Sequence, residues 1–213
     1  MGAIAVIDYG MGNLRSVAKA IEHVTDQRVI VTSDADEIRK ADRIVFPGQG
    51  AIGDAMRHMQ ERDLVDVLHE VVKQKPFLGI CLGLQALMTH SDEDGGVECL
   101  NVIPGKVHHF DHLFNAQDTD TSHLKIPHMG WNQVKQNTDH PLWADIDDNS
   151  RFYFVHSYFI KPELENEIAG TTNYGADFAS AAGADNWFAV QFHPEKSQHD
   201  GLQLLKNFAH WNI

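Results

Sequence analysis

The stretch PFLGICLG at residues 76–83 joins a short apolar run to a segment whose composition favours a helix. Residues 77–80 predict a buried strand, and residues 82–88 predict the helix that follows it. The start of the chain has the same order, because an apolar run at residues 3–8 precedes a glycine-rich turn and a helical pattern. Alternating strands and helices predict an α/β fold: one open, doubly wound, mostly parallel sheet with helices on both faces.

Further apolar runs extend this pattern along the chain. Strands are predicted at residues 29–32, 44–46, 152–155, 168–172 and 188–192, and helices around residues 64–72 and 201–211. After about residue 100 the runs are separated by turn-rich segments, so we expect an antiparallel C-terminal portion attached to the same sheet. No repeat or low-complexity linker appears, and we expect a single domain over residues 1–213.

The charge balance excludes several classes of partner. The chain has 17 Lys and Arg against 30 Asp and Glu, a formal net charge of −13, without the dense basic stretches of nucleic-acid-binding proteins. Its most apolar stretch, residues 76–88, is too short to span a bilayer. Two cysteines and no basic, apolar leader favour a reduced, cytoplasmic protein with no membrane and no nucleic-acid partner.

Cys81 stands at the junction of a predicted strand and helix, between Gly79 and Gly83. A nucleophile on such a tight turn is exposed at the carboxyl end of the strand, where the helix N-terminus lowers the pKa of a thiol. The alternative interpretation is that Cys81 is a small, buried apolar side chain. The five residues alone leave both interpretations open.

A thiol nucleophile needs a base, and the base needs a group that orients it. His193-Pro194-Glu195 offers both directly after an apolar run. Proline disfavours a helical conformation at His193, so we expect an extended tripeptide with His193 and Glu195 on the same side. A His-x-Glu sequence is also common on protein surfaces. The catalytic interpretation is favoured here because the chain also has Cys81 on a tight turn between a predicted strand and helix.

The loop PGQG at residues 47–50 follows another predicted strand. Backbone N–H groups of Gly48, Gln49 and Gly50, with that of Leu82, are candidates to stabilise an oxyanion. The same segment matches the dinucleotide fingerprint G-x-G-x-x-G, but it is not on the first strand and a proline precedes it. The acidic residue expected at a strand end about 20 residues later would fall in a predicted helix, around residues 71–73. We therefore expect no nucleotide cofactor.

The segment from His108 to Lys125 is polar, acidic and rich in histidine, and we expect a surface excursion. His108, His109, Asp111 and His112 are a possible metal site. Without a matching second set of ligands, we interpret them as solvated side chains and expect no metal.

Taken together, these motifs resemble one enzyme family. The segments GICLGLQ (79–85), PGQG (47–50) and FHPEKS (192–197) are similar to those of class I (triad) glutamine amidotransferases. Two more segments, PHMGWN (127–132) and YFVHSY (153–158), are similar to the glutaminase subunits of imidazole glycerol phosphate synthases. The resemblance extends from residue 8 to the final helix and therefore covers nearly the whole chain.

The resemblance implies a role for each motif. A cysteine at the position of Cys81 attacks the amide carbon of glutamine, His193 moves protons, Glu195 orients His193, and water cleaves the γ-glutamyl thioester. The positions expected to bind glutamine are Gln85, Glu93 and, through their backbone, Ser157 and Tyr158.

The resemblance also implies a heterodimer, in which ammonia passes to a (β/α)8-barrel cyclase subunit that forms imidazole glycerol phosphate. The positions expected to face this partner are Asn13, Met129, Trp131 and Lys196. The family usually has valine where this chain has Gln49. Because glutamine is less stiff than a β-branched residue, we expect a different basal or partner-stimulated rate.

Three other functions fit parts of the sequence. A γ-glutamyl hydrolase or stand-alone peptidase uses a similar elbow but needs no partner, which leaves Met129 and Trp131 without a purpose. An amidotransferase for anthranilate or nucleotide synthesis is disfavoured by the segment at residues 127–132. A dinucleotide-binding module rests on the weak glycine fingerprint alone.

Overall fold

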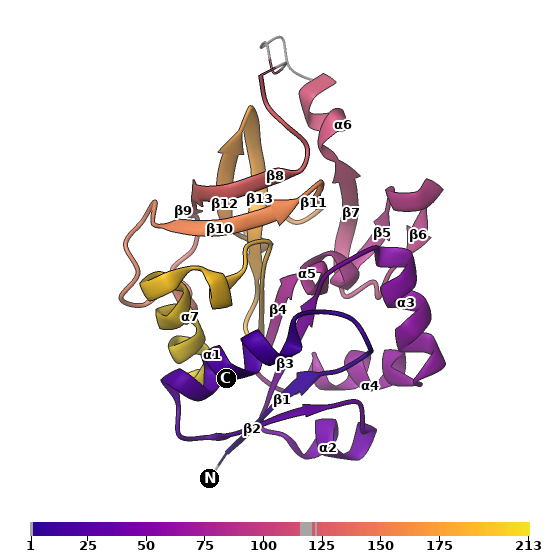
Figure 1. Cartoon of the computed structure of the whole chain (residues 1–213), viewed down its shortest axis with the longest axis vertical. Helices are drawn as coiled ribbons and strands as arrows, with labels where there is room; N and C mark the ends of the chain where they lie inside the picture. The colour runs from indigo at the N-terminus through magenta and orange to yellow at the C-terminus, as the bar shows by residue number, and fades with distance from the viewer. Residues whose placement is uncertain (1, 116–120, 122) are drawn as a thin grey trace.

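Four strands from the first half of the chain and one from near its C-terminal end build the parallel part of the sheet (Figure 1). The structure is a computed structural model that describes residues 2–115, 121 and 123–213. Five neighbouring strands run in parallel, in the order β2 (Arg28–Thr32), β1 (Ala3–Ile7), β3 (Arg43–Gly48), β4 (Phe77–Cys81) and β14 (Trp187–Val190). This arrangement confirms the predicted doubly wound sheet.

Helices cover both faces of these strands, because each strand presents apolar side chains on both sides. Along β1, Ala5 and Ile7 join one buried cluster, while Ile4 and Val6 join the other. The first cluster is covered by α2 (Ala35–Lys40), α3 (Ile52–Glu61) and α4 (Leu64–Val71), and the second by α1 (Leu14–Val24) and α7 (Gln198–His210). Among the described helices, none combines the length and hydropathy that a membrane crossing requires.

The sheet continues beyond β14 with antiparallel strands, as expected for the C-terminal portion. The order β14-β13-β11-β7 is antiparallel at each step, and β5 then pairs with β7 in parallel. These strands are β13 (Ala176–Gly183), β11 (Tyr158–Pro162), β7 (Ile103–His109) and β5 (Met88–Ser91). β6 (Val97–Glu98) pairs with β5 at the edge of the sheet, and β12 (Ile168–Tyr174) pairs with β13 and with β9 (Lys135–Gln136). Short turns of 3-10 helix are η1 (Glu93–Gly95), η2 (Pro141–Trp143), η3 (Glu165–Glu167) and η4 (Pro194–Lys196).

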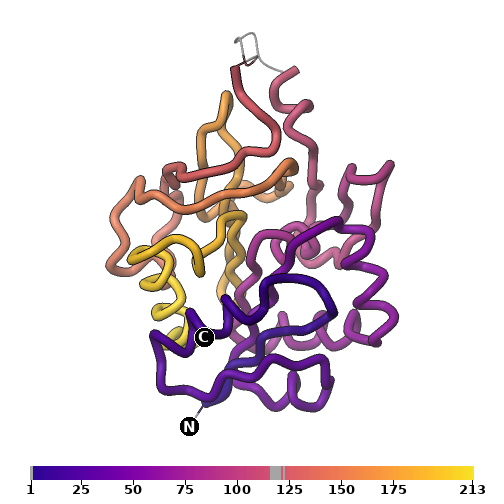
Figure 2. Tube along the Cα trace, viewed as in Figure 1, coloured from indigo at the N-terminus to yellow at the C-terminus, as the bar shows by residue number. Residues whose placement is uncertain are grey.

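One predicted strand lies outside the main sheet. β10 (Arg151–His156) pairs only with β8 (His128–Gln133), and this antiparallel pair crosses in front of the main sheet (Figures 1 and 2). The prediction that residues 152–155 belong to the main sheet was therefore wrong. Along β10, Phe152 and Phe154 are buried while Tyr153 and Val155 are partly exposed, which is the pattern of a layer covered on one face only.

The segment predicted as a surface excursion begins inside the core. His108 and His109 complete β7, and residues Phe110–Asn115 form helix α6. Phe110 is fully buried and packs against the rings of His156, Phe159 and Phe178. The prediction was wrong for this part because one buried aromatic side chain fixes the helix onto the sheet. Residues 116–120 and 122 lie outside the described residues.

The junction of β4 and helix α5 (Leu82–Leu87) depends on a close backbone approach. A Cβ atom at Gly83 would overlap the carbonyl oxygen of Phe46 in β3. Only glycine therefore allows α5 to start directly on the neighbouring strand. This contact fixes the direction in which Cys81, the residue before α5, points.

Two glycine-to-alanine changes test this close approach. We expect Gly83→Ala to lower the free energy of unfolding by about 1–3 kcal/mol, because the added methyl group meets a backbone atom. Gly53→Ala in α3 is the matched control, since its Cβ would meet only ordinary contacts and should stabilise by about 0.4–1 kcal/mol. Urea unfolding measures both values. Equal stability of the Gly83→Ala variant and the parent protein would contradict the argument.

Candidate active site

Cys81 is the last residue of β4 and has a backbone conformation, φ 55° and ψ −110°, that residues other than glycine rarely adopt. Such a conformation costs about 1–3 kcal/mol and persists only where the surroundings impose it. Here β4 is held on both sides by β3 and β14, and Gly48 of β3 lies opposite Cys81 in the register. The thiol, in a residue only 7% exposed, lies at the wall of a pocket of about 760 Å³.

His193 and Glu195 form a buried pair beside this thiol. Nδ1 of His193 lies 2.9 Å from Oε1 of Glu195, and the two side chains are 6% and 1% exposed. His193 itself is extended, but Pro194–Lys196 forms the 3-10 turn η4. The prediction of an extended tripeptide was therefore wrong after His193, because a tight turn brings the carboxylate back to the imidazole.

The pKa of His193 reflects competing effects. Burial alone lowers it, but hydrogen bonds with Cys81 and Glu195, together with the charges of both groups, raise it to about 10. The imidazole therefore carries its proton near neutral pH. A protonated imidazole between Sγ of Cys81 and the carboxylate of Glu195 is a proton donor next to the nucleophile.

Ser197 holds the turn that carries these two residues. Its hydroxyl donates a hydrogen bond of 2.7 Å to the carbonyl of His193 and accepts one of 3.0 Å from the backbone N–H of Tyr153. The N–H of His193 in turn donates to the carbonyl of Tyr153. The turn is thereby fastened to β10, the strand that lies across the main sheet.

Gln191 is a site residue that the sequence analysis missed. Its side chain is fully buried, donates toward Sγ of Cys81 at 3.7 Å, and accepts from Nε2 of Gln85 at 3.1 Å. The same Gln85 amide donates to the carbonyl of Tyr158 at 3.2 Å. The available signal was a polar residue inside an apolar run, because buried amides need partners.

The pocket brings most of the predicted site residues together. Its walls include the catalytic candidates Cys81 and His193, and the further predicted residues Gln49, Gly50, Leu82, Gln85, Glu93, Ser157, Tyr158 and Lys196. Gly48 does not line it but lies opposite Cys81 in the register of β3 and β4. The loop after β3 and segments of β4, α5, η1, β11 and η4 therefore meet in one cavity.

Glu93 connects this pocket to helix α3. Its Oε2 accepts a hydrogen bond of 3.0 Å from the N–H of Ile52, the first residue of α3. Burial raises the pKa of Glu93, and the Ile52 hydrogen bond opposes this shift. The glycine fingerprint at residues 48–53 needs that helix N-terminus for a pyrophosphate, so the carboxylate of Glu93 argues against a dinucleotide there.

A second missed feature is a buried histidine pair beside the pocket. Nδ1 of His128 lies 2.8 Å from Nε2 of His156, whose Nδ1 lies 2.7 Å from the carbonyl oxygen of Tyr158. Asn132 approaches Nε2 of His128 at 3.2 Å. Burial lowers the pKa of His128 to about 4 and that of His156 to about 3, so both rings are neutral at pH 7.

The neutral rings fix the direction of this hydrogen-bond chain. The carbonyl of Tyr158 can only accept, so Nδ1 of His156 carries its hydrogen and Nε2 accepts from His128. Nε2 of His128 then accepts from the amide of Asn132. This row of hydrogen bonds thus runs from Asn132 on β8 to the backbone carbonyl of Tyr158 at the pocket.

The residues predicted to face a partner lie partly together. Met129 and Trp131 on β8 are 62% and 42% exposed, unusually high for large apolar side chains. Trp131 packs edge-on against the ring of Tyr153, and Nζ of Lys196 lies 5.9 Å from the centre of the same ring. Asn13 is exposed just before α1.

Among the described residues, the one group of three metal-ligating side chains lies outside this pocket.

Solved structures of low sequence identity share the fold. The structure of PurLQS from Thermotoga maritima aligns with a TM-score of 0.71 at 15% identity, over 98% of this chain and 97% of that one. A solved structure of a glutamine amidotransferase aligns with a TM-score of 0.68 at 14% identity, over 98% of this chain and 100% of that one. These likenesses show the architecture alone.

Sequence comparisons show the family. The family model described as "Glutamine amidotransferase class-I" matches residues 5–211. The protein named imidazole glycerol phosphate synthase subunit HisH of Pseudomonas syringae pv. syringae is 55% identical over 212 residues, covering 100% of this chain and 99% of the relative. The protein of the same name in Acinetobacter baylyi is 54% identical over 214 residues, covering 100% of both chains. The chain therefore belongs to the class I glutamine amidotransferases, in the group of HisH subunits.

Proposed function

We propose that this chain is the glutaminase subunit of an imidazole glycerol phosphate synthase, and that it hydrolyses L-glutamine to glutamate and ammonia through a thioester on Cys81. The observation that carries the proposal is the charged His193–Glu195 pair next to a thiol on a strained elbow, all at one pocket. The identity with HisH subunits supports the same activity.

The geometry supports a two-step reaction. In the first step, Sγ of Cys81 attacks the amide carbon of glutamine, and the developing oxyanion lies near the N–H of Leu82 and the peptides of residues 48–50. The His193 imidazolium gives its proton to the departing nitrogen, so ammonia and a thioester form. In the second step, neutral His193 takes a proton from water as its oxygen attacks the thioester. Glutamate leaves, and the thiolate and imidazolium are restored.

The pocket offers matching groups to the amino-acid end of glutamine. The carboxylate of Glu93 is suited to the α-ammonium group, and the backbone at Ser157 and Tyr158 to the α-carboxylate. The hydrogen-bonded amides of Gln85 and Gln191 connect Sγ of Cys81 with the carbonyl of Tyr158. No cofactor takes part in these steps.

The partner in this proposal is a cyclase subunit with a (β/α)8 barrel, joined in a cytoplasmic heterodimer. The relatives' names describe them as subunits of a synthase, which supports a partner chain. Met129 and Trp131 form an exposed apolar pair on β8. Trp131 contacts the ring of Tyr153, and Lys196, which lines the pocket, lies over the same ring. The exposed pair is therefore connected to the pocket through Tyr153. We propose that this face, with Asn13, meets the cyclase and passes it ammonia.

The nucleophile is tested by Cys81→Ala. We expect this variant to lose glutamine-dependent product formation in the complex with its cyclase, while ammonium salts still support turnover. Cys99→Ala is the matched control and should retain the glutamine-dependent rate, because burial raises the pKa of the Cys99 thiol to about 12 and keeps it protonated. A glutamine-dependent rate that survives Cys81→Ala would refute the assignment.

The role of Glu195 is tested through the pKa of His193. Glu195→Gln removes the negative charge that raises this pKa and leaves only a neutral hydrogen-bond acceptor, so we expect the pKa of His193 to fall. The imidazole then loses its proton at lower pH than in the parent protein, and the glutaminase rate should fall with the loss of the donor. NMR titration of the His193 ring measures the pKa directly. An unchanged titration curve would exclude Glu195 as the orienting carboxylate.

The partner face is tested by Trp131→Ala. Large exposed aromatic side chains at interfaces often contribute about 2 kcal/mol or more, so we expect the dissociation constant for the cyclase to rise about thirtyfold. Leu164→Ala is the control, because Leu164 is also an exposed apolar residue, at 47%, but lies outside this face. Calorimetric titration with the cyclase gives both constants. A stand-alone hydrolase would instead be favoured if the isolated chain had full glutaminase activity and the Trp131→Ala variant bound the cyclase no more weakly than the parent chain.

A further inference from the structure

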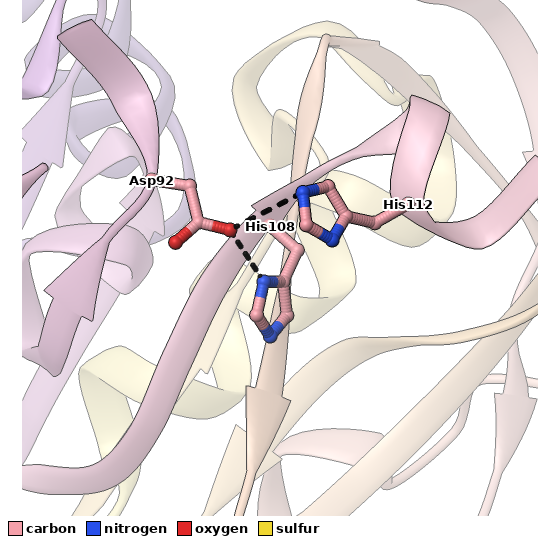
Figure 3. Close-up of side chains that lie close together, drawn as sticks. All are labelled: Asp92, His108 and His112. Atoms are coloured by element: carbon pink, nitrogen blue, oxygen red, sulfur yellow. Dashed lines mark hydrogen bonds and ion pairs between the residues drawn. The ribbon is translucent and has the colours of Figure 1, made fainter. Parts of the chain in front are cut away.

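We infer that Asp92, His108 and His112 form a binding site for Zn²⁺, separate from the glutamine pocket (Figure 3). The three residues come from three elements: the loop after β5, the end of β7 and helix α6. This site goes beyond the glutaminase reaction and uses none of its residues.

Three ligand atoms converge at this position. Oδ2 of Asp92 lies 2.6 Å from Nδ1 of His108 and 3.7 Å from Nε2 of His112, and all three atoms lie within 4.8 Å of one another. The two imidazole rings are stacked with centres 5.3 Å apart. In Figure 3 the ring of each histidine turns toward the same carboxylate oxygen.

A cation could take the place of the direct contact between Asp92 and His108, after small movements of the side chains. The 3.7 Å separation between Asp92 and His112 is too long for a hydrogen bond. Ligand atoms bound at about 2.0–2.1 Å in a tetrahedron lie about 3.3 Å apart. The Asp92–His108 separation of 2.6 Å must therefore widen by about 0.7 Å, and the Asp92–His112 separation of 3.7 Å must shorten by about 0.4 Å. The two histidine nitrogens lie within 4.8 Å of each other and must reach the same spacing. The side chain of His112 is 63% exposed, which leaves room for this movement and for a water as fourth ligand.

The chemistry of the ligands selects the metal. Two imidazole nitrogens and one carboxylate oxygen form a donor set typical of Zn²⁺, with one position left open. The formal net charge of −13 also favours the capture of a cation over an anion.

From the sequence, the ligands considered were His108, His109, Asp111 and His112, and we expected them to be solvated and to bind no metal. His109 pairs instead with Asp111, at 3.1 Å, and its ring packs edge-on against Tyr158. Asp92, which replaces these two residues, comes from a loop 16 residues earlier in the chain than His108. The sheet brings it into place, because the N–H of Asp92 donates to the carbonyl of Val107 in β7.

A cation here would fasten the loop that carries Glu93. Asp92 faces the two histidines, while the next residue, Glu93, reaches the N–H of Ile52 on the pocket side. Binding of Zn²⁺ would therefore join α6 to this loop and reduce its motion. The consequence concerns the order of residues 91–96 and does not depend on the glutaminase assignment.

Calorimetric titration of ZnCl₂ into the tag-free, chelator-stripped chain tests the site. We expect one equivalent of Zn²⁺ to bind, and His112→Ala to lower the affinity at least about tenfold, because even outer-shell partners of a metal contribute that much. His112 is exposed, so this variant should fold normally. His199→Ala is the matched control. His199 pairs with Asp200 at 3.1 Å, the same separation as between His109 and Asp111. No third metal-ligating side chain joins His199 and Asp200 among the described residues.

Two further measurements separate the site from scattered binding by surface histidines. Co²⁺ in place of Zn²⁺ should give the visible absorption bands of a four-coordinate ion in the parent chain and in His199→Ala, but not in His112→Ala. Hydrogen exchange at residues 91–96 should slow on addition of Zn²⁺ in the same two proteins. Equal Zn²⁺ affinity of the parent chain and His112→Ala, or no protection of this loop, would overturn the inference.

Discussion

The close contact between Gly83 and the carbonyl of Phe46 is the constraint on which the site depends. It lets α5 begin on the backbone of β3, and the chain can make that turn only if Cys81 accepts an unfavourable conformation. The strands on either side of β4 supply the burial that outweighs this cost. The backbone of the sheet therefore sets the direction of the thiol, and the side chains of Gln191 and His193 meet it there.

The parallel half of the fold was predictable because its signals are local. Strands buried on both faces read as short apolar runs, and each is followed by a turn and a helical pattern. The layer formed by β8 and β10 was not predictable in this way. Its alternating pattern fits a strand in the main sheet equally well, and only the aromatic packing beneath Phe152 and Phe154 decides between the two positions.

The site was predictable to the extent that its chemistry lies in short motifs. Cys81, His193 and Glu195 are reactive residue types at turns next to apolar strands, which made them candidates, while the family resemblance supplied their roles. Gln191 and the pair His128–His156 could not be found in this way, because each has a partner more than 25 positions away and its burial is a property of the folded chain. The turn at Pro194 was missed for a related reason, since the hydrogen bonds of Ser197 that stabilise it reach another strand.

The chain of Asn132, His128 and His156 joins the exposed strand β8 to the carbonyl of Tyr158 without carrying charge. Histidines usually respond to pH near neutrality, but burial holds both of these rings in the neutral form far below it. Each ring has a single N–H, and the carbonyl of Tyr158 can only accept, so all hydrogen bonds of the row point the same way. Strand β8 and the pocket are thus joined by a row of aligned dipoles that is insensitive to physiological changes in acidity.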